Sequence, residues 1–193
     1  MEEKLQRLYK ECIDELRNIG IDALNLDIGV IDIKISRRNN KRYGCCKQEE
    51  PDKRTKYYEK IRNRKYLKYA KFNKHTIEIS KWVMELDENI IKNTIMHELI
   101  HCFPYCNNHG KDFKKYASII NEKLGYDISR VGDKKEDYKK SNMEYNENIN
   151  FKYKIMCEKC GQTFYRQRLM KNLIRKYRCG KCGGKLIAYT KSN

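Results

Sequence analysis

Three of the four histidines of this chain fall within thirteen residues, and two of them form the pattern His97-Glu98-Leu99-Ile100-His101. Residues four apart lie one turn above each other on a helix, so both imidazoles can reach a single Zn²⁺ from one face. Glu98 projects about 100° around the helix from His97 and can hold and deprotonate a zinc-bound water. The pattern therefore predicts a catalytic zinc site, and the clustering disfavours purely structural imidazoles.

A catalytic zinc needs three protein ligands and one open position, so a third ligand is expected downstream. Glu122 and His109 are the two candidates. Glu122 lies two residues from Ile120, on the side of its predicted helix that should face solvent. His109 lies four residues before Phe113, on the side that must pack against the domain, and Gly110 lets the chain turn there. We favour His109 over Glu122.

Four further cysteines form two C-x-x-C pairs separated by eighteen residues: Cys157, Cys160, Cys179 and Cys182. A glycine follows each pair, and it permits the tight backbone in which amides hydrogen-bond the thiolate sulfurs. Four thiolates close a tetrahedral structural zinc site, so this spacing predicts a zinc ribbon. A redox C-x-x-C is the alternative, but two matched pairs are not needed for thiol exchange.

Hydrophobic periodicity predicts the elements that must position these residues. A spacing of three and four predicts helices, and alternation predicts strands. Helices are expected over 2–19, from an N-cap at Asp87 to just before Pro104, and over 113–124; strands are expected over 24–35, 42–46 and 75–80. Residues 47–74 are too charged to assign. The fold class is α+β: a small helix-plus-short-sheet domain at 1–131, a charged linker at 132–150 and the ribbon at 151–193.

The chain has 43 Lys+Arg against 26 Asp+Glu, a net charge of +17. The excess lies in two segments: residues 34–74 carry 16 basic and 4 acidic side chains, and residues 151–193 carry 12 and 1. Because neutralising phosphates releases counterions, two such segments suggest DNA or RNA as a partner. A lysine-rich solvated surface is the alternative.

Aromatic and basic side chains are interleaved between the two cysteine pairs. Phosphate tracking with base stacking is the functional interpretation, and the alternative is that the aromatics fill the small ribbon core. The candidate nucleic-acid contacts are Tyr165, Arg166, Arg168, Lys171, Arg175 and Arg178.

Mean hydropathy is −0.94, and no window reaches the roughly 18 unbroken apolar residues of a membrane span. The first residues are charged, which argues against a secretory signal. The nine cysteines are an odd number, so reduced thiols in a cytoplasmic setting are expected. Cys12 and Cys102 fit as small buried residues, whereas Cys45, Cys46 and Cys106 have no assignment.

These residues together resemble the SprT-like family of zinc metallopeptidases, whose relatives include the Spartan-type proteases that act on proteins crosslinked to DNA. The likeness covers the N-terminal helix, the helix with His97-Glu98-Leu99-Ile100-His101, the segment His109-Gly110-Lys111-Asp112-Phe113, Leu124-Gly125-Tyr126 and the C-terminal ribbon. Residues 47–74 match weakly. The resemblance implies a zincin-like domain with His97, His101 and His109 as zinc ligands and Glu98 as general base.

The expected function is therefore that of a zinc metalloendopeptidase cleaving proteins associated with DNA, with one catalytic and one structural zinc. The alternative is a non-enzymatic zinc protein that binds nucleic acid through its basic ribbon. An intact Glu98 favours the enzyme, since a structural site needs no base.

Overall fold

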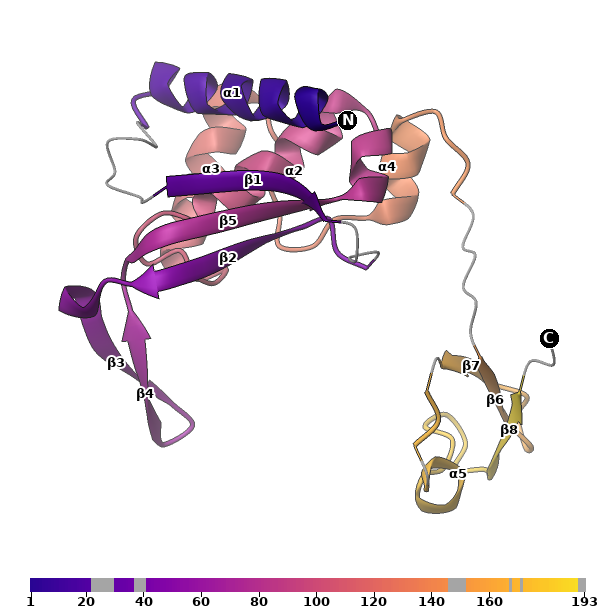
Figure 1. Ribbon diagram of the computed structural model, residues 1–193. Coiled ribbons are helices and arrows are strands. Elements are labelled where there is room, and N and C mark those ends of the chain that lie inside the picture. Colours follow the sequence, from indigo (N-terminus) through magenta and orange to yellow (C-terminus); the bar gives the residue numbers. More distant parts are fainter. Residues whose placement is uncertain (22–29, 37–40, 146–151, 167, 171, 191–193) are drawn as a thin grey trace. The chain divides into compact units, whose positions relative to one another are not determined.

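The computed structural model describes residues 1–21, 30–36, 41–145, 152–166, 168–170 and 172–190. It divides the chain into two compact units, Met1–Tyr145 and Asn146–Asn193 (Figure 1). Both contain small sheets and helices, so the chain is mixed α/β. No helix in the described ranges has the length and apolar character that crossing a membrane requires.

The sheet of the first unit has three strands, β1 (Val30–Ser36), β2 (Gly44–Pro51) and β5 (Phe72–Ser80), in the order β1-β5-β2. β5 is central, parallel to β1 and antiparallel to β2. The strand expected over 75–80 is confirmed as part of β5, and residues 44–46 of the strand expected over 42–46 are the start of β2, whereas Arg42 and Tyr43 precede it. Of the predicted strand region 24–35, residues 24–29 lie outside the described residues. β2 forms an edge of this sheet.

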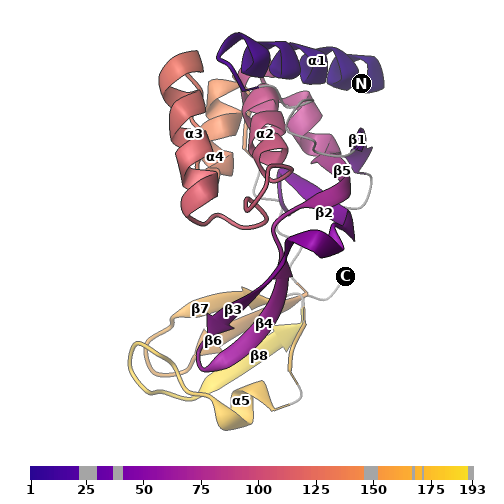
Figure 2. The ribbon, with the colours of Figure 1, turned by 90° about the vertical axis from the view of Figure 1, so that its left-hand side faces the viewer.

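The first unit has three longer helices: α1 (Glu2–Asn18), α2 (Glu88–Ile100) and α3 (Lys111–Leu124). α1 and α2 pack against each other and against the sheet, and α3 packs against α2. α1 buries Leu5, Leu8 and Leu16 fully, on the face that its sequence spacing predicted. α2 contacts α1, α3, β2 and β5. In Figure 2 it lies between α3 and the three-stranded sheet. This central position explains why α2 is buried on most of its sides.

The ends of α2 decide the geometry of the histidine pair. Asp87 is the N-cap, as predicted, and its side chain accepts a hydrogen bond from the backbone N–H of Asn89 at 2.9 Å. The helix ends at Ile100, earlier than the predicted end just before Pro104. His101 is the C-cap and keeps αR backbone angles (φ −64°, ψ −15°), so the one-turn spacing from His97 is preserved. α3 ends before Gly125, as predicted.

Residues 47–74, which the sequence left unassigned, contain the end of β2, a separate two-stranded hairpin and the start of β5. After β2, the short 3-10 helix η1 (Lys53–Thr55) leads into β3 (Lys56–Ile61) and β4 (Arg64–Tyr69), which pair antiparallel and return to β5. The two-residue turn, Arg62 and Asn63, has φ of 45° and 65°, as a type I′ turn requires. Figure 1 shows the hairpin projecting beyond the three-stranded sheet.

Part of the predicted linker 132–150 is a helix of the first unit. α4 (Lys134–Lys140) follows the N-cap Asp133, and Tyr138 stacks on Trp82 of the 3-10 helix η2 (Lys81–Glu85) with ring centroids 6.1 Å apart. The Tyr43 hydroxyl donates a hydrogen bond to Asp137. The linker prediction is therefore wrong for residues 132–145, because aromatic and polar contacts hold a segment that has few aliphatic residues. Residues 146–150 lie outside the described residues.

The second unit is a three-stranded antiparallel sheet with a short helix. Its elements are β6 (Tyr153–Cys157), β7 (Thr163–Arg166), α5 (Leu173–Lys176) and β8 (Leu186–Thr190), with strand order β7-β6-β8. Ile155 and Leu186 form its small core together with Cys157 and Cys179. A core of this size gives the unit little hydrophobic stabilisation, so the cysteines must carry much of its structure.

Candidate metal centres

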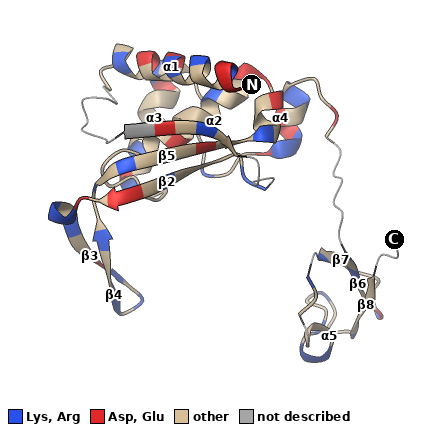
Figure 3. Ribbon diagram, viewed as in Figure 1, with Lys and Arg blue, Asp and Glu red and all other residues tan. Residues whose placement is uncertain are grey.

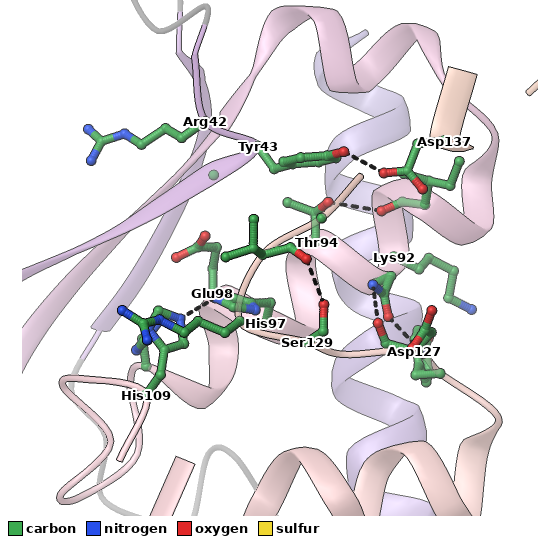
Figure 4. Close-up of a pocket in the computed structure, with 18 of the residues that line it drawn as sticks. Arg42, Tyr43, Lys92, Thr94, His97, Glu98, His109, Asp127, Ser129 and Asp137 are labelled. Carbon is green, nitrogen blue, oxygen red and sulfur yellow. Dashed lines mark hydrogen bonds between the residues drawn. The ribbon is translucent and has the colours of Figure 1, made fainter. Parts of the chain in front are cut away.

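Three histidine side chains meet at the end of α2. His97 lies in the last turn of α2, His101 is its C-cap, and His109 lies just before α3. One ring nitrogen of each lies within 4.8 Å of the others, and the Nε2 atoms of His97 and His109 are 3.0 Å apart. The predicted third candidate His109 thus joins the pair, whereas Glu122 is exposed on α3 and lies outside this group. Figure 4 shows His97 and His109 side by side.

Backbone carbonyls orient two of the three imidazoles. Nδ1 of His101 lies 2.7 Å from the carbonyl oxygen of Cys106, which can only accept, so Nδ1 carries the proton and Nε2 keeps its lone pair. His97 makes a similar backbone hydrogen bond to Ser129. Such hydrogen bonds fix the ring and the tautomer of a metal-ligating histidine.

Burial keeps these imidazoles neutral. It lowers the pKa of His97 to about 4, with the neighbouring His101 and His109 adding to the effect. It also lowers the pKa of His101 and of His109. Neutral imidazole is the form that binds a metal ion, so the group is a possible metal site. The ring of Phe113 supports all three histidines, with centroid distances of 4.7 to 4.9 Å.

Glu98 is held between α2 and β2. Its side chain is only 6% exposed, and burial raises its pKa to about 7 against a backbone hydrogen bond from Cys46 and the charge of Arg42. β2 approaches this carboxylate closely because position 44 is glycine: a Cβ there would lie 2.7 Å from Oε1 and 2.8 Å from Cγ of Glu98. Gly44 therefore shapes the space that the carboxylate occupies.

A cleft of about 1100 Å³ opens over these residues. Its walls include the three histidines and Glu98, the segment from Ser129 to Asp133, and four residues of β2: Gly44, Cys45, Cys46 and Gln48. Gln48 is one of the lining residues, and its Nε2 donates to the carbonyl oxygen of His101 at 3.2 Å. Figure 4 shows that Glu98 and His97 line this cleft together with side chains of the 127–137 segment. The edge strand β2 is thus one wall of the cleft.

The four cysteines of the two C-x-x-C pairs also converge. Their sulfurs lie within 4.8 Å of one another, with Cys157 to Cys182 at 3.5 Å and Cys160 to Cys179 at 3.6 Å. Hydrogen bonds from the backbone N–H groups of Cys160 and Lys159 lower the pKa of Cys157 to about 7. A backbone N–H, that of Lys181, likewise lowers the pKa of Cys179. At Cys182 the backbone N–H of Gly184 acts in the same direction, but the neighbouring thiols and burial outweigh it and raise the pKa to about 12. The amide-to-sulfur arrangement that the sequence predicted is therefore present, and it favours the thiolate form at Cys157 and Cys179.

Five of the six candidate nucleic-acid contacts are exposed on the second unit. Tyr165 and Arg166 are neighbours on β7 and so point to opposite faces of the sheet. Arg168, Arg175 and Arg178 are exposed outside the strands. Lys171 lies outside the described residues.

Several residues of the histidine site were not found from the sequence. Cys46 acts through its backbone N–H, and Cys106 and Ser129 act through their backbone carbonyls. Every residue type other than proline carries both groups, so the side-chain type gives no signal. Gly44 acts by lacking a side chain. Cys12 and Cys102 are buried, as expected, and the Cys46 and Cys102 sulfurs lie 3.6 Å apart.

Comparison with known proteins shows which family the sequence matches. The family model for the SprT-like family matches residues 3–132, which include the histidine group and Glu98. "Protein SprT-like" of Lactococcus lactis subsp. lactis (strain IL1403) is 36% identical over 107 residues, 53% of this chain and 60% of that relative. The protein of the same name from Staphylococcus carnosus (strain TM300) is 35% identical over 118 residues, 58% of this chain and 67% of the relative.

A third relative, "Protein SprT-like" of Streptococcus suis (strain 05ZYH33), is 29% identical over 111 residues, 55% of this chain and 65% of the relative. The chain thus spans less than two thirds of the Lactococcus and Streptococcus relatives. The four-cysteine cluster lies beyond the residues that the family model matches. With two thirds of its residues matched by the family model, this chain belongs to the SprT-like family.

Proposed function

We propose that this protein is a zinc metalloendopeptidase with a zincin-like domain that cleaves proteins associated with DNA. The observation that carries the proposal is the convergence of three neutral imidazoles beside a buried glutamate at the wall of an open cleft. Membership of the SprT-like family supports it. The reduced cysteines fit a cytoplasmic location.

Zinc fits the donor set. Three histidine nitrogens with no carboxylate among them match a catalytic zinc site, which has three protein ligands and one open position. His101 and His97 already have the backbone hydrogen bonds that orient zinc-ligating imidazoles. When bound, zinc would polarise the scissile carbonyl and make water a better nucleophile near neutral pH.

The residues of the chain supply the remaining requirements of peptide hydrolysis. Glu98 would accept a proton from the attacking water and pass it to the leaving amine. The edge strand β2 borders the cleft, and its backbone groups could pair with an extended substrate as an added strand. An extended polypeptide is therefore the substrate class that the cleft supports best.

The four-cysteine cluster is proposed as a closed structural zinc site, which makes the second unit a zinc ribbon. The 12 basic side chains and one acidic side chain of residues 151–193 support binding of this unit to nucleic acid. The same charge supports the second candidate function, a non-enzymatic nucleic-acid-binding zinc protein. A buried Glu98 beside the histidines favours the peptidase, because a structural site needs no base.

A cleavage assay tests the proposed function. Purified zinc-loaded protein is mixed with a basic DNA-binding protein, with and without single-stranded DNA, and products are followed by gel electrophoresis and mass spectrometry. Cleavage that needs zinc and Glu98 supports the peptidase. Zinc-loaded protein that binds DNA but leaves the substrate intact would favour the non-enzymatic alternative.

Gly44→Ala is expected to slow peptide hydrolysis without removing zinc. The added Cβ would lie 2.7 Å from Oε1 of Glu98, so the carboxylate must move, and a shift of about 1 Å can cost about 100-fold in rate. The measurement is the rate of hydrolysis beside the zinc content of the same sample. Lys47→Ala is the control, because its side chain pairs with Glu78 on the opposite face of β2. A Gly44→Ala rate equal to that of Lys47→Ala would contradict the role of Gly44.

Gly184→Ala is expected to weaken zinc binding at the four-cysteine cluster. A Cβ at position 184 would lie 2.8 Å from the sulfur of Cys157 and 3.3 Å from that of Cys182, so the metal ligands would be displaced. The measurement is zinc affinity by competition with a chromophoric chelator. Gly180→Ala is the matched control in the same loop region, since a Cβ there meets nothing within 4 Å. Equal affinity of the two variants would refute this prediction.

A further inference from the structure

The outer part of the β3–β4 hairpin exposes its side chains on both faces. Every residue from Lys60 to Leu67 is exposed, and the exposed set includes large apolar side chains. Those of the whole hairpin are Tyr58, Ile61, Tyr66 and Leu67, which are 69%, 43%, 42% and 47% exposed. A two-stranded hairpin is by itself only marginally stable in water, and the ring contact of Tyr57 with Tyr105 lies at its base. Its conformation and its exposed side chains therefore suggest a binding element.

The base of the hairpin is fixed to the loop that carries the histidine site. Asp52 caps η1, and Thr55 donates to the carbonyl of Asp52 while accepting from the backbone N–H of Lys71 at 3.1 Å. The backbone N–H of Tyr105 donates to the carbonyl of Ala70 at 2.8 Å. Tyr105 lies between His101 and His109 in sequence, so this bond ties the hairpin to the loop that joins two of the three histidines.

Six basic side chains and one acidic side chain occupy the hairpin. The basic residues are Lys56, Lys60, Arg62, Arg64, Lys65 and Lys68, and Glu59 is the acidic one (Figure 3). In the described part of the chain none of the six basic side chains forms an ion pair. An excess of this kind on a projecting element calls for a polyanionic partner.

The strand register distributes these charges over both faces. Residues directly opposite each other share a face, so Lys60 and Lys65 lie on one face and Arg64 lies with Ile61 on the other. Arg62 occupies the turn between the strands. A single nucleic-acid strand bound along one face of the hairpin would leave the cations of the other face without phosphate contacts. A groove with phosphates along both edges would place phosphates near the cations of both faces.

We propose that the β3–β4 hairpin binds in the major groove of B-form duplex DNA. This groove, about 12 Å wide, admits a two-stranded β-ribbon and is lined by phosphates along both edges. The major groove of A-form RNA is too narrow and deep for such an element, so DNA fits better than duplex RNA. The proposal builds on the DNA association in the proposed function but does not require peptidase activity.

The test uses the full-length zinc-loaded chain and fluorescence anisotropy. The probes are a labelled DNA duplex of about 20 base pairs, its single strand, and the duplex RNA of the same sequence, at several salt concentrations. Glu98→Gln is the background for all measurements, so that no proteolysis intervenes. The first double variant is Lys60→Ala with Lys65→Ala, and the second is Arg62→Ala with Arg64→Ala. Lys10→Ala with Lys123→Ala is the control, with the same charge change at exposed sites on α1 and α3.

Both hairpin variants are expected to weaken duplex DNA binding by about tenfold or more at low salt. Each should also lower the slope of log affinity against log salt by about 2, since each removes two phosphate contacts. The control should bind as the parent does, and thermal melting should show that all variants fold. The parent should prefer duplex DNA to the RNA duplex.

Two results would overturn the proposal. Duplex binding unchanged in both hairpin variants would place DNA on another surface, such as the C-terminal unit. A loss confined to Lys60 and Lys65, together with tighter binding of the single strand, would show that one face tracks single-stranded DNA. Either result leaves the peptidase proposal untouched, because binding and cleavage are measured separately.

Discussion

Glu98→Gln is expected to reduce peptide hydrolysis by about 100- to 10,000-fold, the range typical for loss of a general base. Glutamine has nearly the same size as glutamate, so it fits the space that Gly44 leaves between α2 and β2. It cannot accept a proton, although it can still accept a hydrogen bond from the backbone N–H of Cys46. Because Glu98 lies outside the histidine group, zinc content should be unchanged.

The measurement is the rate of substrate cleavage, and of any self-cleavage, at equal zinc content and equal melting temperature. Glu122→Gln is the matched control, since it makes the same chemical change at an exposed glutamate on α3. If Glu98→Gln cleaves at the rate of Glu122→Gln, Glu98 is not the base. If neither variant nor the parent shows cleavage with zinc bound and DNA present, the non-enzymatic alternative gains support.

The helices were predictable from the sequence because each has a clear apolar period and a definite end. Leu5, Leu8 and Leu16 mark the buried face of α1. Asp87 marks the beginning of α2 and Gly125 marks the end of α3, as in the structure. The central strand β5 was predictable from the alternation between residues 75 and 80. These signals come from side chains that face a core on one side only.

The hairpin and α4 were not predictable for the opposite reason. β3 and β4 are solvated on both faces over their outer part, so no apolar alternation marks them as strands. α4 buries no residue, and it is held by the stacking of Tyr138 on Trp82 and by the Tyr43 bond to Asp137. Contacts between residues as far apart in sequence as Tyr43 and Asp137 leave no trace in local composition. The charged segment therefore looked like a linker.

The histidine site was partly predictable. His97, Glu98 and His101 were predictable because residues four apart lie one turn above each other on a helix. His109 was preferred to Glu122 because it lies on the same side of the predicted helix as Phe113. The groups that orient them did not follow, because a carbonyl of Cys106 or Ser129 is present whatever the side chain. Gly44 differs from these groups, because its close approach to Glu98 does require a particular residue type, glycine. The sequence does not show which residue lies opposite Gly44; that follows only from the pairing of β2 with β5.

The second large effect is expected for metal content. His109→Ala should reduce bound zinc from two equivalents to one, because two histidines one turn apart supply too few ligands to hold a catalytic zinc against dialysis. Elemental analysis of dialysed protein measures this directly. Glu122→Ala should keep both equivalents, since its carboxylate is exposed and outside the histidine group. Cleavage activity should disappear in His109→Ala along with the zinc.

The zinc that remains in His109→Ala identifies which site was lost. Four sulfurs close their metal completely, so this equivalent should resist a chelator longer than the three-histidine equivalent, which keeps an open position. Wild-type protein should therefore release zinc in a fast and a slow phase, and His109→Ala should show the slow phase only. Two equivalents retained in His109→Ala, or a fast phase that disappears in Glu122→Ala instead, would mean that the third ligand is not His109. The convergence of the three rings around Phe113 would then serve packing rather than metal binding.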